Sequence, residues 1–434
     1  MALADIYRGT LAVIQGDAQS AIGWVEAGLV RLPESAQHAR ARAFDVLGSA
    51  YQHTGDARQA ERYFLQAGAL AEAGSVAYLA INARCEAAQV QMLQGRLTEA
   101  VQTCEEALRV SRTPIPPQGL AWAFLGEIAR ERNELTTAEQ HVQKGLALAQ
   151  QGGLTDDVVM ALGFLAWVKH HQGDADSAQQ LFAQLVRLVR TYKIDWLMQR
   201  AAAHQARLDL MQGRLDAAAQ WARAYQETRA AHTVGYVRDV EDLTLARVLL
   251  AESEPRRAHA LLDAVLSQAQ PAGRMRRVIE AKMLTALAFH REGHLAEALY
   301  ALHEAVTIAA PERWRRVFLD EGDALAALLP HVHTAAPAFV DELLALLHSP
   351  TIAETVSAPS YKASALPIPG EILSEREVEI LRLLADGLSN REISAALYIG
   401  VGTVKWYLTN LYSKLDVGNR TQAVVRAREW GLLA

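Results

Sequence analysis

Residues 400–415 contain no acidic side chain and combine a lysine and a tryptophan with several hydroxyl groups. If this stretch is helical, its apolar residues share one face: Val404, Leu408, Leu411 and Leu415. The opposite face then presents Thr403, Lys405, Trp406, Thr409 and Ser413. Hydroxyls and lysine hydrogen-bond base edges in the major groove of DNA, and an apolar group contacts the thymine methyl. We therefore predict a helix that reads duplex DNA, against the alternative of a bundle end that packs on the rest of the chain.

The charge distribution favours the same prediction. Residues 371–399 carry six acidic and three basic residues, whereas residues 400–434 carry two acidic and five basic ones. The whole chain has a formal net charge of −6, so a positive surface for nucleic acid must be local.

Three further short helices are expected to position this recognition helix. A serine followed three residues later by a glutamate, the capping-box pattern, occurs at residues 374–377 and again at 389–392. The first helix is expected to end at Gly387, and the last to begin near Asn419. Two short helices joined by a glycine-containing turn and flanked by others predict a helix-turn-helix domain over residues 371–434.

A tag of the form Gly-(Asp/Arg/His)-x-x-x-Ala recurs upstream at steps of 38 to 40 residues, with Asn or Ser in place of Gly at two of its copies. Its first positions are Gly16, Gly55, Gly95, Asn133, Gly173, Gly213, Ser253 and Gly293. Gly and Asn tolerate the left-handed conformation that ends many helices, and the alanine lets the next helix pack closely. Each copy therefore predicts the turn of a helical hairpin.

One hairpin cannot bury its apolar face alone, whereas stacked hairpins can. We predict an all-α fold, in which residues 1–310 form a tetratricopeptide-like solenoid of about eight forty-residue repeats. Residues 311–348 are expected to form a helical cap, and the proline-rich residues 349–370 a flexible linker. The first helix begins almost at Met1, so either the parent protein extends further, or something covers that end, or the chain is a short natural version.

Composition and spacing argue against several other classes. The N-terminus does not resemble a signal peptide, and no stretch of 18 uncharged apolar residues could span a membrane. Cys85 and Cys104 lack zinc-site spacing and are expected to be buried. Neither residues 303–307, which lack the second His of HExxH, nor His331 with His333 predict a metal site. We expect a cytoplasmic protein that is not an enzyme, with no cofactor, metal ion or membrane partner.

Two aromatic and basic sets have alternative interpretations. Four tryptophans are expected in the core rather than along a ligand groove: Trp122, Trp167, Trp196 and Trp221. The basic run at residues 313–316 is expected to be a solvated helix face rather than a DNA-binding patch.

The last domain resembles the LuxR-type DNA-binding domain in the stretches LSEREVEIL (373–381), GLSNREI (387–393) and GTVK…KL…NRTQA (402–423). With the repeats and the segment FLDEG (318–322), the whole chain resembles the MalT-like family of large ATP-binding LuxR regulators. This resemblance implies a transcription activator that binds double-stranded DNA as a homo-oligomer and works with RNA polymerase. Its solenoid would sense a small-molecule inducer or a protein partner.

The resemblance also implies roles for single residues. Base contacts fall on Lys405, Trp406 and Thr409. Contacts with the DNA backbone fall on Ser389, Asn390, Thr403, Lys414 and Arg420. The fourth helix supplies a dimer surface with Ala423, Val424 and Ala427.

The sequence departs from the family pattern in three places. Gly400 stands where the family usually has Ser, and Tyr407 stands where it often has His. The sequence also has no GxxxxGK[ST] motif, so control by ATP is not assigned to this chain. Two function classes are left: a ligand-responsive transcription factor, or a solenoid adaptor whose C-terminal module docks it to DNA or to itself. An enzyme would require an ATPase module upstream of Met1.

Overall fold

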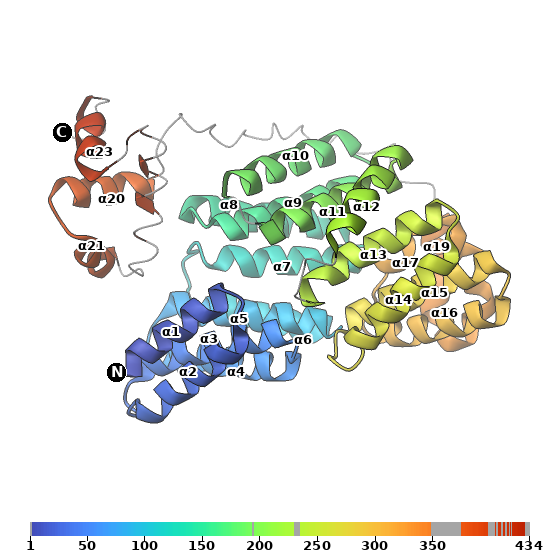
Figure 1. Cartoon of the computed structure of the whole chain (residues 1–434), viewed down its shortest axis with the longest axis horizontal. Coiled ribbons are helices and arrows are strands. Elements are labelled where there is room, and N and C mark those ends of the chain that lie inside the picture. The colour runs from blue at the N-terminus through green and yellow to red at the C-terminus, as the bar shows by residue number, and fades with distance from the viewer. Residues whose placement is uncertain are drawn as a thin grey trace. The chain divides into compact units, whose positions relative to one another are not determined.

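The computed structural model describes residues 2–192, 195–229, 235–348 and 375–397, with 404, 407, 408, 411, 412, 415, 417 and 419–429. These residues form two compact units, a helical array that ends at His348 and a group of C-terminal helices that begins at Glu375. All regular elements of the described residues are helices (Figure 1), so the prediction of an all-α fold is confirmed.

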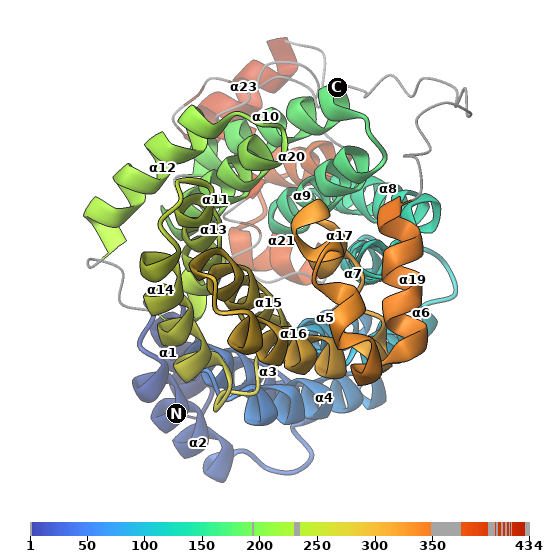
Figure 2. The same cartoon turned by 90° about the vertical axis from the view of Figure 1, so that its right-hand side faces the viewer.

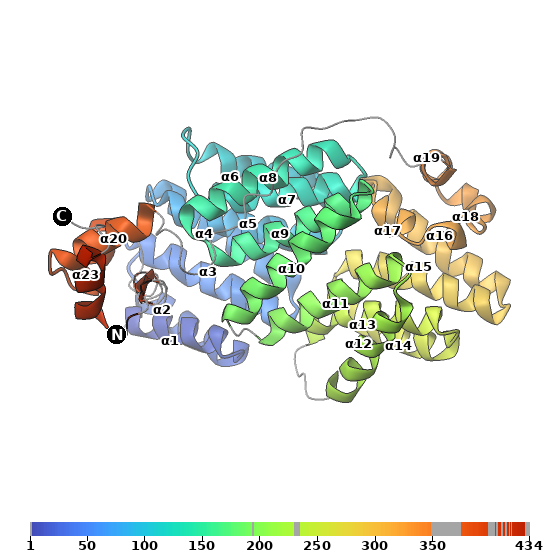
Figure 3. The same ribbon diagram turned by 90° about the horizontal axis from the view of Figure 1, so that it is seen from above.

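Helices α1 to α16 form eight successive hairpins, which Figure 3 shows stacked side by side. Their bounds are α1 (Ala2–Ile14) and α2 (Ala18–Arg31), α3 (Gln37–Thr54) and α4 (Ala57–Ala73), α5 (Ala77–Leu93) and α6 (Leu97–Arg109), α7 (Gln118–Glu131) and α8 (Leu135–Gly152), α9 (Thr155–His171) and α10 (Ala175–Tyr192), α11 (Asp195–Met211) and α12 (Leu215–Thr228), α13 (Gly235–Ala251) and α14 (Pro255–Ala269), and α15 (Met275–Glu292) and α16 (Leu295–Ala309).

The turn between the two helices of each hairpin has the predicted conformation. All eight turn residues have a positive φ, from 59° at Asn133 to 84° at Gly173. The alanine five residues after each turn is fully buried in all eight hairpins. At Ala138 the reason is visible, because a Cβ on Gly126 of the facing helix would lie only 2.9 Å from the Ala138 carbonyl oxygen. The repeat tag therefore marks both a left-handed helix end and a close helix contact.

The array curves so strongly that its last hairpin returns to its third (Figure 2). Helix α15 contacts α5, and a Cβ on Gly95, just after α5, would lie 3.1 Å from the Cβ of Met275 at the start of α15. Helices α5 and α15, each the first helix of its hairpin, thus lie on an inner side of the array where distant repeats meet.

After α16 the chain continues through η2 (Ala310–Glu312), α17 (Arg316–Leu319), α18 (Asp323–Ala326), η3 (Leu329–Ala335) and α19 (Pro337–His348). Phe318, Leu329 and Phe339 belong to the same hydrophobic core as the central and last hairpins. The prediction of a solvated face at residues 313–316 is wrong, because Trp314 is fully buried and Arg315 is 6% exposed. The curvature of the array carries this basic segment into contact with earlier repeats.

The C-terminal unit contains α20 (Glu375–Ala385), α21 (Asn390–Leu397) and α23 (Arg420–Glu429). Its core includes the predicted apolar face of the recognition helix, since four residues of that face are at most 5% exposed: Val404, Leu408, Leu411 and Leu415. The linker predicted at residues 349–370 lies outside the described residues.

Two smaller predictions concern buried side chains. Cys85 and Cys104 are buried as expected, and burial raises the pKa of both thiols. Trp167 is a core residue at 7% exposure, whereas Trp122 and Trp221 are only partly buried.

Candidate functional site

The predicted capping box at the start of α21 is formed. The backbone N–H of Glu392 donates to Ser389 Oγ at 3.4 Å, and the backbone N–H of Ser389 donates to the Glu392 carboxylate at 2.7 Å. These hydrogen bonds lower the pKa of Glu392. They fix the N-terminus of the second helix of the helix-turn-helix, with Asn390 as its first residue.

Arg420, which the family resemblance assigned to a phosphate, makes two hydrogen bonds inside the module. Its Nη1 donates to the Leu388 carbonyl and its Nη2 to the Leu384 carbonyl, each at 2.8 Å. These carbonyls lie at and just beyond the end of α20, where the helix dipole favours a cation. Arg420 therefore joins the start of α23 to the end of α20, and its DNA contact stays a prediction.

The fourth helix places its two alanines inward. Ala423 and Ala427 are fully buried in the module's own core, Val424 packs against that core, and Val425 is 51% exposed. The dimer role of this helix stays a prediction.

Five predicted DNA-contacting residues lie outside the described residues: Thr403, Lys405, Trp406, Thr409 and Lys414. Tyr407, where the family often has His, is buried in the module's core.

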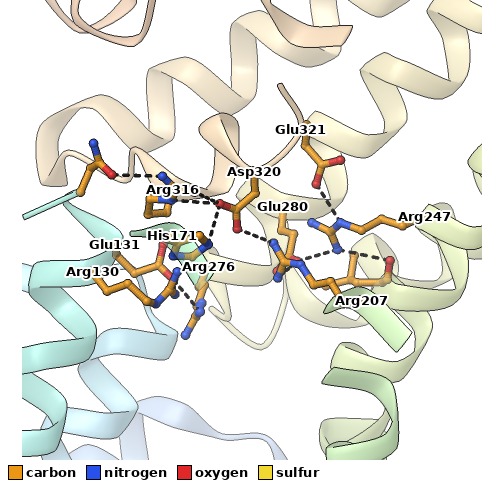
Figure 4. A network of polar contacts seen from close by, with 12 residues as sticks. Arg130, Glu131, His171, Arg207, Arg247, Arg276, Glu280, Arg316, Asp320 and Glu321 are labelled. Atoms are coloured by element: carbon orange, nitrogen blue, oxygen red, sulfur yellow. Dashed lines mark hydrogen bonds and ion pairs between the residues drawn. The ribbon is translucent and has the colours of Figure 1, made fainter. Parts of the chain in front are cut away.

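Within the array, Asp320 is the centre of a buried polar network (Figure 4). Its carboxylate accepts hydrogen bonds from Arg316 Nε and from Arg207 Nη2, both at 2.9 Å, and His171 Nε2 lies 3.1 Å away. The Asp320 side chain is 4% exposed. Burial alone would raise the pKa of Asp320, but the cationic groups around it outweigh burial, and the pKa lies well below its usual value.

The network continues through Glu280 of α15. This carboxylate lies 2.8 Å from Arg247, 3.2 Å from Arg277 and 3.6 Å from Arg207. Arg247 in turn donates from Nε to Glu321 at 2.8 Å. Residues 320 and 321 are thus paired with side chains from α9, α11 and α13, while Glu280 joins α11, α13 and α15.

A second part of the network connects the returning hairpin with α7. Arg276 of α15 lies 2.7 Å from Glu131 and 3.3 Å from Glu127, and Arg130 Nε donates to Glu127 at 2.8 Å. Burial of Glu127 would raise its pKa, but the two arginines lower it to about 2. The ion pairs therefore connect the distant repeats that the curvature brings together.

Backbone groups also hold the returning segment. Trp314 Nε1 donates to the Gly95 carbonyl at 3.2 Å, and the backbone N–H of Arg315 donates to the Glu131 carbonyl at 3.0 Å. We name residues 310–322 the inner segment. Sequence reasoning missed its position, although a tryptophan among three arginines was a signal of a buried anchor.

Two histidines near this network are neutral at physiological pH. Burial lowers the pKa of His171 to about 3. Burial, followed by the charges of Arg200 and Arg207, lowers the pKa of His204 to about 3. Both rings therefore resist protonation where arginines already supply positive charge.

One cavity of about 430 Å³ opens between α10, α11 and α12. Its lining is mainly apolar and includes Val189, Met198 and Trp221, together with Asp209. Trp221 stacks on Tyr225 with ring centroids 5.3 Å apart. This tryptophan thus has the partial exposure that the groove-lining alternative required, while the side chain of Trp196 lies outside the described residues.

Within the described part of the chain, no group of His, Cys, Asp and Glu side chains could hold a metal ion. No helix there is long and apolar enough to cross a membrane.

Comparison with known proteins agrees with the two units. Residues 3–335 match the family described as MalT-like TPR region, and residues 371–427 match the bacterial regulatory proteins of the luxR family. The HTH-type transcriptional regulator MalT of Vibrio cholerae is 23% identical over 97% of this chain, and that of Klebsiella pneumoniae is 24% identical over 97%. In both cases the match covers 49% of the relative, so the chain spans about half the length of these curated relatives.

Among solved structures, a Rap protein complexed with competence and sporulation factor aligns with a TM-score of 0.53 at 12% identity, over 80% of this chain and 97% of that protein. This likeness concerns the fold of the repeats. The match over residues 3–335 covers more than half of the chain, and the chain therefore belongs to the MalT-like family, with the helix-turn-helix domain of the luxR-type regulators.

Proposed function

We propose that the chain is a transcription activator whose C-terminal helices bind duplex DNA and whose helical array receives the controlling signal. The observation that carries the proposal is the burial of Val404, Leu408 and Leu411 at helical spacing in the module's core. A helix with this face inside would turn its other side outward, and that side carries the hydroxyl, lysine and tryptophan groups that suit a major groove.

The proposed base contacts are those of Lys405, Trp406 and Thr409. The proposed contacts with the DNA backbone are those of Ser389, Asn390, Thr403, Lys414 and Arg420. Ser389 and Asn390 start α21, and backbone N–H groups at a helix N-terminus favour a phosphate. A single module of this size buries little DNA surface, so we expect two copies on neighbouring half-sites, with RNA polymerase as the further partner.

We place the sensing step on the inner side of the array. There ion pairs help to hold the inner segment, beside its apolar anchors, and a small molecule, a peptide or a protein partner could replace these ion pairs. The fold likeness to a Rap protein complexed with competence and sporulation factor favours a ligand or partner on a helical array. Such a ligand acts only if it binds one arrangement of the array better than another.

The test is selection from a random duplex DNA library with the full chain. We expect one enriched motif, bound more tightly than unrelated DNA. Lys405→Ala should weaken binding to this motif by about 1–3 kcal/mol and relax the preference at one base pair.

Arg428→Ala is the matched control, because it removes one positive charge from an exposed position of α23 outside the predicted interface. It should leave the base preference intact. No enriched motif, with equal affinity for all duplexes, would instead support the solenoid adaptor. Equal weakening of all DNAs by Lys405→Ala would remove its base-reading role.

A further inference from the structure

The residue eleven positions before each turn residue differs between the hairpins of the array. It lies in the first helix of the hairpin. In seven of the eight hairpins its side chain is larger than that of alanine: Asp5, Phe44, Arg84, Trp122, Leu162, Asp242 and Lys282. In α11 the residue at this position is Ala202. The sixth hairpin therefore has a methyl group where every other hairpin has a longer or bulkier side chain.

Contacts in two other hairpins show which space this side chain fills. Phe44 of α3 stacks on Tyr63 of α4, with ring centroids 5.9 Å apart. Trp122 of α7 lies against His141 of α8, with ring centroids 5.1 Å apart. Tyr63 and His141 both follow their turn residue by eight positions. The second and fourth hairpins thus use the same pair of positions for a contact between two rings, one from each helix.

In the sixth hairpin the same two positions are Ala202 of α11 and Trp221 of α12. The methyl group of Ala202 is too short to reach across the hairpin as a ring does. Both residues line the cavity of about 430 Å³ between α10, α11 and α12. Trp221 stacks instead on Tyr225 of its own helix. The cavity therefore lies where the second and fourth hairpins pack an aromatic side chain.

The walls of this cavity suit an apolar ring. They include Val186, Val189 and Met198 beside Trp221. Small-molecule sites in proteins are mostly apolar with a few polar groups, and they usually enclose about 300–1,000 Å³. A ligand with an aromatic ring would stack on the indole of Trp221 and fill the space that a side chain fills in the other two hairpins.

The charged side chains of the lining do not require a charged ligand. Asp209 Oδ1 accepts hydrogen bonds from Gln205 Nε2 and from Arg214 Nε, each at 3.0 Å, so this carboxylate already has partners. Arg190 is exposed to solvent. Gln199 adds an amide to the lining, and an amide can hydrogen-bond a hydroxyl group or a ring N–H of a ligand.

We propose that this cavity binds a small uncharged aromatic molecule, whose ring stacks on Trp221 in the space left by Ala202. We name the cavity the ring site. None of its lining residues belongs to the inner segment or to the C-terminal unit. The inference therefore goes beyond the proposed function and does not depend on it.

The test is equilibrium dialysis of naphthol against the full chain without DNA. Naphthol combines a fused aromatic ring with one hydroxyl group. We expect saturable binding, and we expect Ala202→Phe to weaken it by at least about tenfold, because the new ring would occupy the site as Phe44 occupies it in the second hairpin. Ala217→Phe is the matched control, since it adds the same side chain at an exposed position of α12 outside the cavity. This control should bind naphthol like the unaltered chain.

Two further measurements test the aromatic contact. Trp221→Leu should weaken naphthol binding without filling the cavity, so this variant tests the site even if Ala202→Phe fails to fold, which circular dichroism would show. Decahydronaphthol, the saturated counterpart of naphthol, has no aromatic face and should bind more weakly to the unaltered chain.

Three outcomes would overturn the proposal. The first is no binding of naphthol up to its solubility limit. The second is binding that neither Ala202→Phe nor Trp221→Leu weakens more than Ala217→Phe does, which would mark an adventitious apolar contact elsewhere. The third is equal binding of decahydronaphthol, which would refute the aromatic class of the ligand. Selection of DNA is measured separately, so the proposed function can hold or fail independently.

Discussion

Replacing Asp320 by Asn would remove the central negative charge of the buried network while nearly keeping the side chain's size. The carboxylate pairs with Arg207 and Arg316, both at 2.9 Å, and is 4% exposed. Removing one partner of a buried ion pair costs about 3–5 kcal/mol. Arg207 keeps Glu280 at 3.6 Å and Arg316 keeps Asn133 Oδ1 at 3.1 Å, so we expect the lower end, about 3 kcal/mol.

The loss should appear as local opening of the inner segment, because stacked repeats do not unfold as one cooperative unit. Hydrogen exchange followed by mass spectrometry measures this directly. A change of about 3 kcal/mol corresponds to a roughly hundredfold fall in protection for peptides of the inner segment. Peptides from α3 and α4 should keep their protection.

Asp341→Asn is the control, since Asp341 on α19 pairs with His333 at 3.1 Å but its side chain is 68% exposed. An exposed pair of this kind contributes about 0–1 kcal/mol, so little change is expected. If Asp320→Asn lowers protection no more than Asp341→Asn does, the network does not hold the inner segment and our assignment of its role fails.

Three further predictions concern the buried histidines, the Trp314 anchor and Arg420 of the C-terminal unit. The depressed pKa values of His171 and His204 mean that the unfolded chain binds more protons between about pH 6.5 and 3. Stability should therefore fall with falling pH there, by up to about 1.4 kcal/mol per pH unit for each histidine. Replacing both by Gln should flatten the pH dependence of hydrogen-exchange protection in α9 and α11, corrected for the intrinsic exchange rate, and an unchanged dependence would contradict the assignment. Trp314→Ala should destabilise the array by about 3–5 kcal/mol, because it leaves a cavity at a fully buried site and removes the hydrogen bond to the Gly95 carbonyl. Hydrogen exchange should show this as a loss of protection in the inner segment. Unaltered protection there would argue against the anchoring role of Trp314. Arg420→Ala should lower the unfolding free energy of the C-terminal unit by about 2–3 kcal/mol, because two hydrogen bonds are lost. If the variant also lowers the salt dependence of DNA binding by about one ion, Arg420 contacts a phosphate as well. An unchanged salt dependence would leave Arg420 a purely structural role.

The hairpins of the array were predictable because their signals are local. A left-handed helix end requires a residue that tolerates a positive φ, and the chain meets this requirement even at Asn133 and Ser253, where glycine is absent. The same holds for the C-terminal unit. The capping box of Ser389 and Glu392 involves residues only three positions apart, so its sequence pattern alone predicts its hydrogen bonds.

The position of the inner segment could not be derived in this way. Array curvature results from a small rotation at each hairpin, and no single residue encodes the sum. Arg315 and Arg316 look like solvated residues in the sequence. The returning chain brings Arg315 to the Glu131 carbonyl at the end of α7 and Arg316 to Asn133 just beyond it. Arg420 is a similar case, because its carbonyl partners lie at and just beyond the end of α20, more than thirty positions earlier in the chain.

The use of charges on the inner side has a physical consequence for the control proposed above. Burying ion pairs rarely stabilises a protein more than well-packed apolar groups would, since the cost of removing charges from water offsets most of their attraction. Buried ion pairs instead require that every charged group keeps a partner. If Asp320 moves away, Arg207 and Arg316 must pair with another anion or become hydrated. An apolar side chain in the same place would repack against its neighbours after a small shift, whereas a charged side chain favours a few discrete arrangements of the inner segment. A ligand with its own anionic groups could satisfy the same arginines in a different arrangement, and this replacement is the differential affinity that a population shift requires.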